Sequence, residues 1–172
     1  MIFFSSSKWA IFKENAINTV ECPSTGVWDV IQDQCYSTQT NLNKSEAQDY
    51  CNSIGGRILE PRDELTYKIV HSFYVKYEFE NSWLGITGEE SSLEGETSGF
   101  LKDWSHVFWS YDSDNTLVHF ENWKRNKPYG LKENNCVIMD LKAEVEMSWN
   151  NIMCNDTDTF VICETGDSLE GD

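Results

Sequence analysis

Residues 83–86 read Trp83-Leu84-Gly85-Ile86, a short apolar stretch on which the fold prediction depends. Such a run, bounded by polar sequence, is typical of a buried strand. Similar apolar or aromatic runs follow it and predict further short strands: Phe108-Trp109, Leu117 to Phe120, Trp123, Cys136 to Met139, and Phe160 to Cys163. The polar stretch from Glu89 to Gly99 is predicted to be a loop. The second half of the chain is therefore predicted to be mainly β-structure.

A first helix is predicted upstream of this strand, beginning at Asn43. Asn43 and Glu46 form a capping-box pattern, in which each side chain bonds the other residue's backbone N–H. Apolar residues then recur at the spacing of one helix face: Ala47, Tyr50, Cys51 and Ile54. Gly55-Gly56 is predicted to end this helix.

A second helix is predicted to follow Pro61. Leu65, Ile69 and Phe73 lie on one stripe of that helix, with Val70 beside them. Because the helices come first and the strands later, the predicted fold class is α+β.

The composition limits the function classes. The chain has 172 residues, of which 40% are hydrophobic and 13% aromatic, so a disordered chain is excluded. Lys and Arg total 13 and Asp and Glu total 29, which gives a formal net charge of −16. Such an acidic chain repels phosphate groups, so nucleic acid and anionic membranes are not expected partners. No apolar run reaches the ~18 residues needed to span a membrane.

Six cysteines predict three disulfides and a secreted or extracellular protein. Spacing alone does not choose among the alternative pairings, and a reduced protein with buried thiols is the alternative. The N-terminal residues 1–12 make a poor secretion signal, because they lack a basic segment and Ser5 to Lys8 interrupt the apolar stretch. Two glycosylation sequons, Asn43-Lys44-Ser45 and Asn155-Asp156-Thr157, agree with secretion.

The sequence gives no sign of catalysis. His71, His106 and His119 are scattered and lack the spacing of a helical metal site. Asp103, Ser105 and His106 are adjacent, but a catalytic triad is defined by geometry, and no glycine-flanked nucleophile is present. We therefore expect a protein that is not an enzyme.

Several short motifs, in order, resemble those of the C-type lectin-like domain in its long, six-cysteine form. The resemblance spans about Cys22 to Glu164. Residues 83–86 are similar to the family's Trp-Ile-Gly-Leu core strand. The other matching motifs are Phe120-Glu121-Asn122-Trp123, Asn135-Cys136-Val137, Trp149-Asn150-Asn151, and Cys154 through Ile162-Cys163-Glu164.

The resemblance implies the fold, the pairing and the boundaries. It implies two helices packed on small antiparallel sheets, with a long irregular loop region at about residues 88–136 that carries the binding surface. The implied disulfides are Cys22–Cys35, Cys51–Cys163 and Cys136–Cys154. The predicted divisions are an N-terminal leader at 1–21, the domain at 22–164, and an acidic tail at 165–172.

The family's calcium ligands are mostly replaced in this chain. In calcium-dependent members the ion is bound by a Glu-Pro-Asn motif, by a Glu two residues before the fourth domain cysteine, and by a Trp-Asn-Asp motif. The matching residues here are Lys127-Pro128-Tyr129, Asn134, and Trp149-Asn150-Asn151. Asn134, Asn150 and Asn151 are neutral candidate metal ligands, and Lys127 adds a like charge that repels a cation. Pro128 matches the family's cis proline.

Two alternatives leave a role for calcium. Glu133 could take the place of Asn134 if the alignment slips, and Asp140, Glu144 and Glu146 could form a relocated calcium site. The family's auxiliary calcium site is also altered, because Gly88 stands where members carry an Asp.

The resemblance implies a glycan or glycoprotein as the ligand. The predicted carbohydrate-binding residues are Lys127, Tyr129, Asn134, Asn150 and Asn151. Trp83, Trp109, Trp123 and Trp149 could also stack on sugars, but we predict that they are core residues. One alternative is a calcium-independent module that binds a protein through the same loop face. Another is a mineral-binding or ice-binding role, of which the acidic surface favours mineral.

Overall fold

The computed structural model describes residues 21–31, 34–90, 107–129, 135–142 and 147–165. Two helices and eight strands occur in these ranges, which confirms the α+β class. The helices are α1 (Lys44–Ser53) and α2 (Glu64–Tyr77). The strands are β1 (Asp29–Ile31), β2 (Gln34–Gln39), β3 (Arg57–Ile58), β4 (Asn81–Glu90), β5 (Val107–Tyr111), β6 (Cys136–Asp140), β7 (Ser148–Ile152) and β8 (Phe160–Glu164). No helix in these ranges is both long and apolar enough to cross a membrane.

The strands form one connected mixed sheet, which corrects the expectation of small antiparallel sheets. The order is β1-β2-β8-β4-β6-β7, with β3 also paired to β8 and β5 to β4. β4 and β8 pair in parallel, whereas the other named pairs are antiparallel. All five residues of β8 are buried, so this strand joins the two halves of the sheet through the core.

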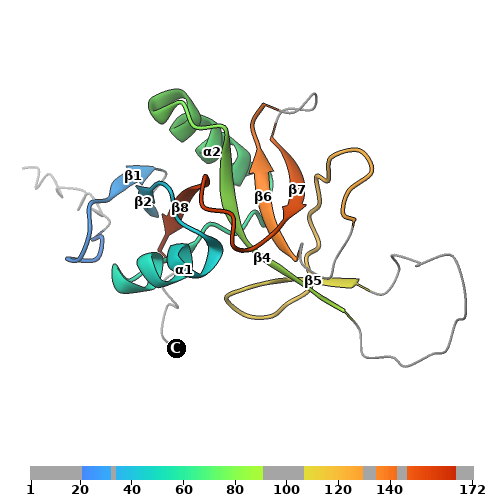
Figure 1. Ribbon diagram of the computed structural model, residues 1–172. Helices are drawn as coiled ribbons and strands as arrows, with labels where there is room; N and C mark the ends of the chain where they lie inside the picture. Colours follow the sequence, from blue (N-terminus) through green and yellow to red (C-terminus); the bar gives the residue numbers. More distant parts are fainter. Residues whose placement is uncertain (1–20, 32–33, 91–106, 130–134, 143–146, 166–172) are drawn as a thin grey trace, which may run out of the picture.

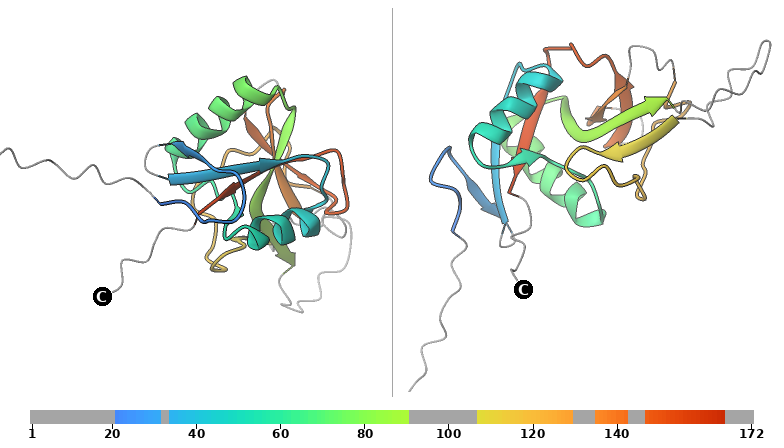
Figure 2. Two further views of the ribbon diagram at one scale, coloured as in Figure 1. Left: turned by 90° about the vertical axis from the view of Figure 1, so that its left-hand side faces the viewer. Right: turned by 90° about the horizontal axis from the view of Figure 1, so that it is seen from below.

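The two helices pack on opposite sides of β8, as the views in Figures 1 and 2 agree. α2 contributes Ile69, Val70 and Phe73 to the larger apolar cluster. α1 contributes Ala47 and Cys51 to the smaller one. The central strands thus have a separate apolar core on each face, and both faces are removed from water.

The start of α1 is confirmed in detail. Asn43 caps the helix: its side chain accepts a hydrogen bond from Glu46 N at 2.9 Å, and Glu46 Oε2 accepts one from Asn43 N at 3.0 Å. Gly55, after the helix, has φ +85°, a left-handed conformation that glycine adopts without steric cost.

The buried stripe of α2 differs by one residue from the prediction. Asp63 caps this helix by accepting hydrogen bonds from Leu65 N and Thr66 N. The buried set is Thr66, Ile69, Val70 and Phe73, which is the i, i+3, i+4, i+7 pattern. Leu65 lies at the border of that stripe and is 37% exposed.

Three strand predictions need correction. β4 continues to Glu90, because Gly88 and Glu89 still pair with β5, so the predicted loop begins later than Glu89. Residues 117–120 form no strand and contribute only the isolated bridge between Leu117 and Ser110. Trp149-Asn150-Asn151 lies in a strand, β7, which the apolar patterns had not predicted.

Tryptophan and cysteine side chains occupy the core. Trp83 and Trp149 are fully buried and Trp109 is 7% exposed, which confirms their predicted core role, whereas Trp123 is only partly buried and packs against the core. The disulfides are Cys22–Cys35, Cys51–Cys163 and Cys136–Cys154, the pairing that the resemblance implies. Thr165 N donates to Cys35 O at 3.0 Å, so the ends of the described domain meet.

Two carboxylates are buried where β8 meets β3. Glu60 and Glu164 are only 3% and 6% exposed. Glu164 Oε1 accepts hydrogen bonds from Arg57 Nε at 3.2 Å and from Glu60 N at 3.1 Å. Burial raises the pKa of Glu164 to about 7, because the cost of desolvating the carboxylate exceeds the attraction of Arg57.

Glu164 therefore makes stability depend on pH. Its pKa in the folded protein is above the ordinary value of 4.5, so its stabilising contribution is complete below about pH 4.5 and is lost as pH rises through about 7. We expect Glu164→Gln, which keeps an acceptor for Arg57 and Glu60 N, to remove a pH dependence on the order of 3 kcal/mol between pH 5 and pH 8. Urea unfolding at both pH values measures this difference. The exposed control Glu121→Gln should retain the wild-type pH dependence, and an unchanged pH dependence in Glu164→Gln would contradict the assignment.

Candidate functional site

A loop at residues 124–129, here called the Tyr129 loop, is fastened to β7. Lys124 N donates to Trp149 O at 2.9 Å, and Trp149 N donates to Asn122 O at 2.7 Å. The ring of Trp123 packs edge-on against Trp149, which fixes the start of the loop on the core. The peptide bond between Lys127 and Pro128 is cis, as the resemblance implies.

Asn151 fixes the other end of the loop. Its Oδ1 accepts from Tyr129 N at 3.1 Å, and its Nδ2 donates to Tyr129 O at 2.7 Å. The Asn151 side chain is 2% exposed, so these two hydrogen bonds satisfy both ends of a buried amide. The carboxamide that the sequence offered as a metal or sugar ligand thus positions the backbone of Tyr129.

The Lys127 ammonium lies over the Tyr129 ring. Its Nζ is 3.7 Å from the ring centroid, within the range of a cation–π contact. The same Nζ donates to the Asn151 backbone oxygen at 3.5 Å. Burial lowers the pKa of Lys127, and the charge of Lys124 lowers it further, whereas Tyr129 raises it.

Tyr129 is the exposed member of this group. Its side chain is 51% exposed although its backbone is fixed by Asn151. An aromatic ring held in this way offers apolar contact area at little cost in conformational entropy. The arrangement can pack against the C–H face of a sugar or against an apolar side chain, and Lys127 adds a cation beside the ring.

The other two predicted site residues are Asn150 and Asn134. Asn150 is half-buried, and its Oδ1 has no hydrogen-bond partner within the described ranges. Asn134 lies outside the described residues, as do Glu133, Glu144 and Glu146. The structure thus brings together Lys127, Tyr129 and Asn151.

Asp140, a candidate for a relocated calcium site, is in an ion pair. Lys124 Nζ lies 3.1 Å from Asp140 Oδ2, and Asp140 Oδ1 accepts from Lys142 N. Among the residues that the structure describes, no group of three or more His, Cys, Asp or Glu side chains could hold a metal ion. The role of Lys124 could not be predicted from the sequence, because its partner Asp140 lies 16 residues further along the chain and no local pattern links the two.

Comparison with protein families gives a match over most of the chain. Residues 40–165 match the family model of the lectin C-type domain. The chain is 24% identical over 147 residues to a perlucin-like protein of Mytilus galloprovincialis, which covers 84% of this chain and 83% of the relative.

Solved structures share the fold at low sequence identity. The SPL-1–GlcNAc complex superposes with a TM-score of 0.62 at 19% identity, covering 86% of this chain and 97% of that one. The carbohydrate-recognition domain of cow CD23, solved in the presence of a GlcNAc2Man3 oligosaccharide, gives 0.61 at 19% identity, with 88% and 100% covered. At this level of identity the likeness establishes the fold alone.

The stabilising role of Asn151 can be distinguished experimentally from that of Asn150. We expect Asn151→Ala to lower the free energy of unfolding by about 1–3 kcal/mol, because it leaves the Tyr129 N–H and C=O without their partners. The Tyr129 amide should also exchange its hydrogen faster. The matched variant Asn150→Ala should change stability by less than about 0.5 kcal/mol, since the Asn150 oxygen already lacks a partner. Chemical unfolding and hydrogen exchange measure both, and equal effects of the two variants would contradict this assignment.

Proposed function

The chain belongs to the C-type lectin domain family, and from that premise we propose that it is an extracellular glycan-binding module that works without the family's usual calcium ion. The domain is a binding module and not an enzyme. We place the ligand face at Lys127 and Tyr129, with Asn151 as the residue that positions the Tyr129 backbone and Asn150 next to it on β7. Asn134, the remaining predicted residue, lies outside the described residues.

The observation that carries this proposal is the fixed and exposed ring of Tyr129. Asn151 holds the backbone of Tyr129 through two hydrogen bonds, and Lys127 lies over its ring. A sugar presents an apolar C–H face that packs on such a ring, and its hydroxyls bond to nearby amides. The Lys127 ammonium would add an attraction for a carboxylate or sulfate group on an acidic sugar.

The residues at the family's calcium position do not fit that ion. Calcium takes six to eight oxygen ligands, with several carboxylates in tight sites. Here the described residues at the matching positions offer no carboxylate. The amide of Asn151 is already bonded to Tyr129, the Asn150 Oδ1 is a single neutral oxygen, and the ammonium of Lys127 lies 3.5 Å from Asn151 O. Two like charges about 4 Å apart repel by a few kcal/mol at an effective dielectric near 20. Binding at this face is therefore proposed to rest on the chain's own side chains.

Relatives support a sugar ligand by analogy. The SPL-1 structure is a complex with GlcNAc, and the cow CD23 domain was solved with an oligosaccharide. Those ligands belong to those proteins, and they suggest the class of ligand to test here.

A protein partner is the second candidate. Phe108 and Leu117 are 48% and 60% exposed, and they come from segments that the bridge between Ser110 and Leu117 brings together. Exposed apolar side chains of this size favour contact with a protein surface more than with a sugar. Binding that Phe108→Ser abolishes and Tyr129→Ala leaves intact would favour this candidate.

Binding to a glycan array, with calcium and with EDTA, tests the proposal. We expect the same glycans to bind in both buffers. For the best glycan, Tyr129→Ala should weaken affinity about tenfold or more, which corresponds to about 1.4 kcal/mol, whereas Tyr129→Phe should retain binding because the ring remains. Lys127→Ala should weaken binding most for acidic glycans.

Lys68→Ala is the matched charge control, because Lys68 is an exposed lysine on α2. It should bind as the wild type does. Glycan binding that EDTA abolishes, or that survives unchanged in both Tyr129→Ala and Lys127→Ala, would contradict the proposal.

A further inference from the structure

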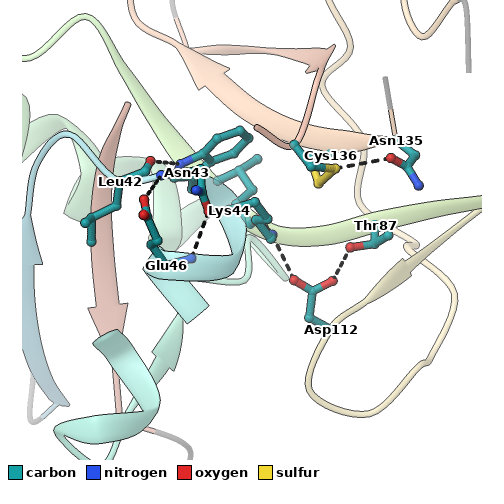
Figure 3. Close-up of a disulfide and its surroundings, with 11 residues drawn as sticks. Leu42, Asn43, Lys44, Glu46, Thr87, Asp112, Asn135 and Cys136 are labelled. Carbon is teal, nitrogen blue, oxygen red and sulfur yellow. Dashed lines mark hydrogen bonds and ion pairs between the residues drawn. A yellow bond between two sulfur atoms is a disulfide. The ribbon is translucent and has the colours of Figure 1, made fainter. Parts of the chain in front are cut away.

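Both glycosylation sequons of this chain open onto the same hollow. The hollow has a volume of about 580 Å³ and lies beside the N-terminal half of α1. Figure 3 shows part of its wall, where Lys44 reaches Asp112 and Asp112 accepts a hydrogen bond from Thr87. The lining residues are Asn43, Lys44, Ser45, Gln48, Asp49, Thr87, Asp112, Cys154 and Asn155.

The two sequon asparagines differ in their surroundings. Asn155 is exposed in the turn between β7 and β8, as is Thr157, the hydroxyl residue of its sequon. Within the described ranges no hydrogen bond or ion pair involves the Asn155 side chain. Asn43, in contrast, caps α1, and Ser45 lies in the first turn of that helix.

The turn that carries Asn155 is held firmly although its side chain is exposed. Cys154 is bonded to Cys136, and Lys44 N donates to Cys154 O at 3.0 Å, which ties the turn to the start of α1. The backbone at Asn155 is therefore held in a fixed position at the rim of the hollow. A group attached to it begins beside the N-terminal half of α1.

We propose that Asn155 carries an N-linked glycan and that the first sugar of this glycan lies in the hollow beside α1. In the reaction, a bond forms between Asn155 Nδ2 and C1 of the first N-acetylglucosamine. The bond between C1 and the diphosphate of a polyprenyl-linked oligosaccharide donor breaks, the amide loses one proton, and the polyprenyl diphosphate leaves. The donor and the transferase belong to the secretory pathway, so this proposal rests on the extracellular location included in the proposed function.

The hollow suits a sugar because its lining combines mainly apolar surface with a few polar groups. Gln48 and Asp49 on α1 and Thr87 on β4 supply an amide, a carboxylate and a hydroxyl for sugar hydroxyls and for the acetamido group. The ion pair between the buried Lys44 Nζ and the partly exposed Asp112 Oδ2, at 2.8 Å, stabilises this wall.

The glycan would leave the Tyr129 loop uncovered. In Figure 1 the chain between β7 and β8 runs from β7 toward α1, whereas the segment with Lys127 and Tyr129 lies on the other side of β7. Glycosylation and ligand binding are thus placed on separate parts of the surface.

Glycopeptide mass spectrometry tests the site. The full chain is directed into the secretory pathway of a eukaryotic cell line, and protein from both the medium and the cell lysate is analysed. We expect a glycan on the peptide that contains Asn155. Asn155→Gln and Thr157→Ala should each lose that glycan, whereas Thr157→Ser keeps the sequon and should retain it. Ser45→Ala removes the other sequon without touching the Asn43 cap, and it should leave the Asn155 glycan in place.

An unmodified Asn155 in the wild-type chain, or a glycan on Asn43 alone, would overturn the proposal. This readout is independent of ligand binding, so failure of the glycan array and failure of glycosylation are distinguished.

Hydrogen exchange tests the position of the first sugar. A glycosidase that leaves a single N-acetylglucosamine should preserve slow exchange in the peptide covering residues 43–49, and an amidase that removes the whole glycan should speed it. Equal exchange in the two preparations would overturn the placement in the hollow.

Discussion

The disulfide between Cys51 and Cys163 joins the helix on one face of the sheet to the strand at its centre, and the other elements are arranged around that link. β8 is paired with β2, β3 and β4, and its five residues are buried. The disulfide closes a loop of 112 residues, for which chain-entropy models expect a stabilisation of about 4–5 kcal/mol. With β8 fixed in this way, β4 and β6 extend the sheet toward β7, and β7 carries the residues that hold the Tyr129 loop.

The candidate site follows from that scaffold through a few backbone contacts. β7 presents Trp149 to the core and Asn151 to the Tyr129 loop, so one short strand provides both the packing anchor and the polar anchor. The loop in turn holds Lys127 over the Tyr129 ring. Lys127, in the motif where the resemblance implies calcium ligands, thus supplies a positive charge beside that ring. In the proposed function, the ligand is recognised by the Tyr129 ring and the Lys127 ammonium group.

Local patterns in the sequence predicted the parts of the fold that local physics controls. The capping box at Asn43 and Glu46 placed the start of α1, because its hydrogen bonds involve residues three apart. The parallel pairing of β4 with β8 could not be predicted in this way, since the paired residues are almost eighty positions apart. The burial of Glu164 could not be predicted from the sequence, because a carboxylate next to an acidic tail is expected to lie at the surface. Lys127 and Tyr129 were predicted as site residues, but the contact between them depends on Asn151, which only the folded strand brings near.

Isothermal titration calorimetry of calcium into the oxidised protein, with a thermal melt in calcium and in EDTA, tests the central claim most directly. An ion that binds only the folded state must raise the melting temperature. The account predicts no binding heat at up to low-millimolar calcium and the same melting temperature in both buffers, because Lys127 and the bonded Asn151 replace the ion's ligands. A stoichiometric site of micromolar to low-millimolar affinity that stabilises the fold would contradict it.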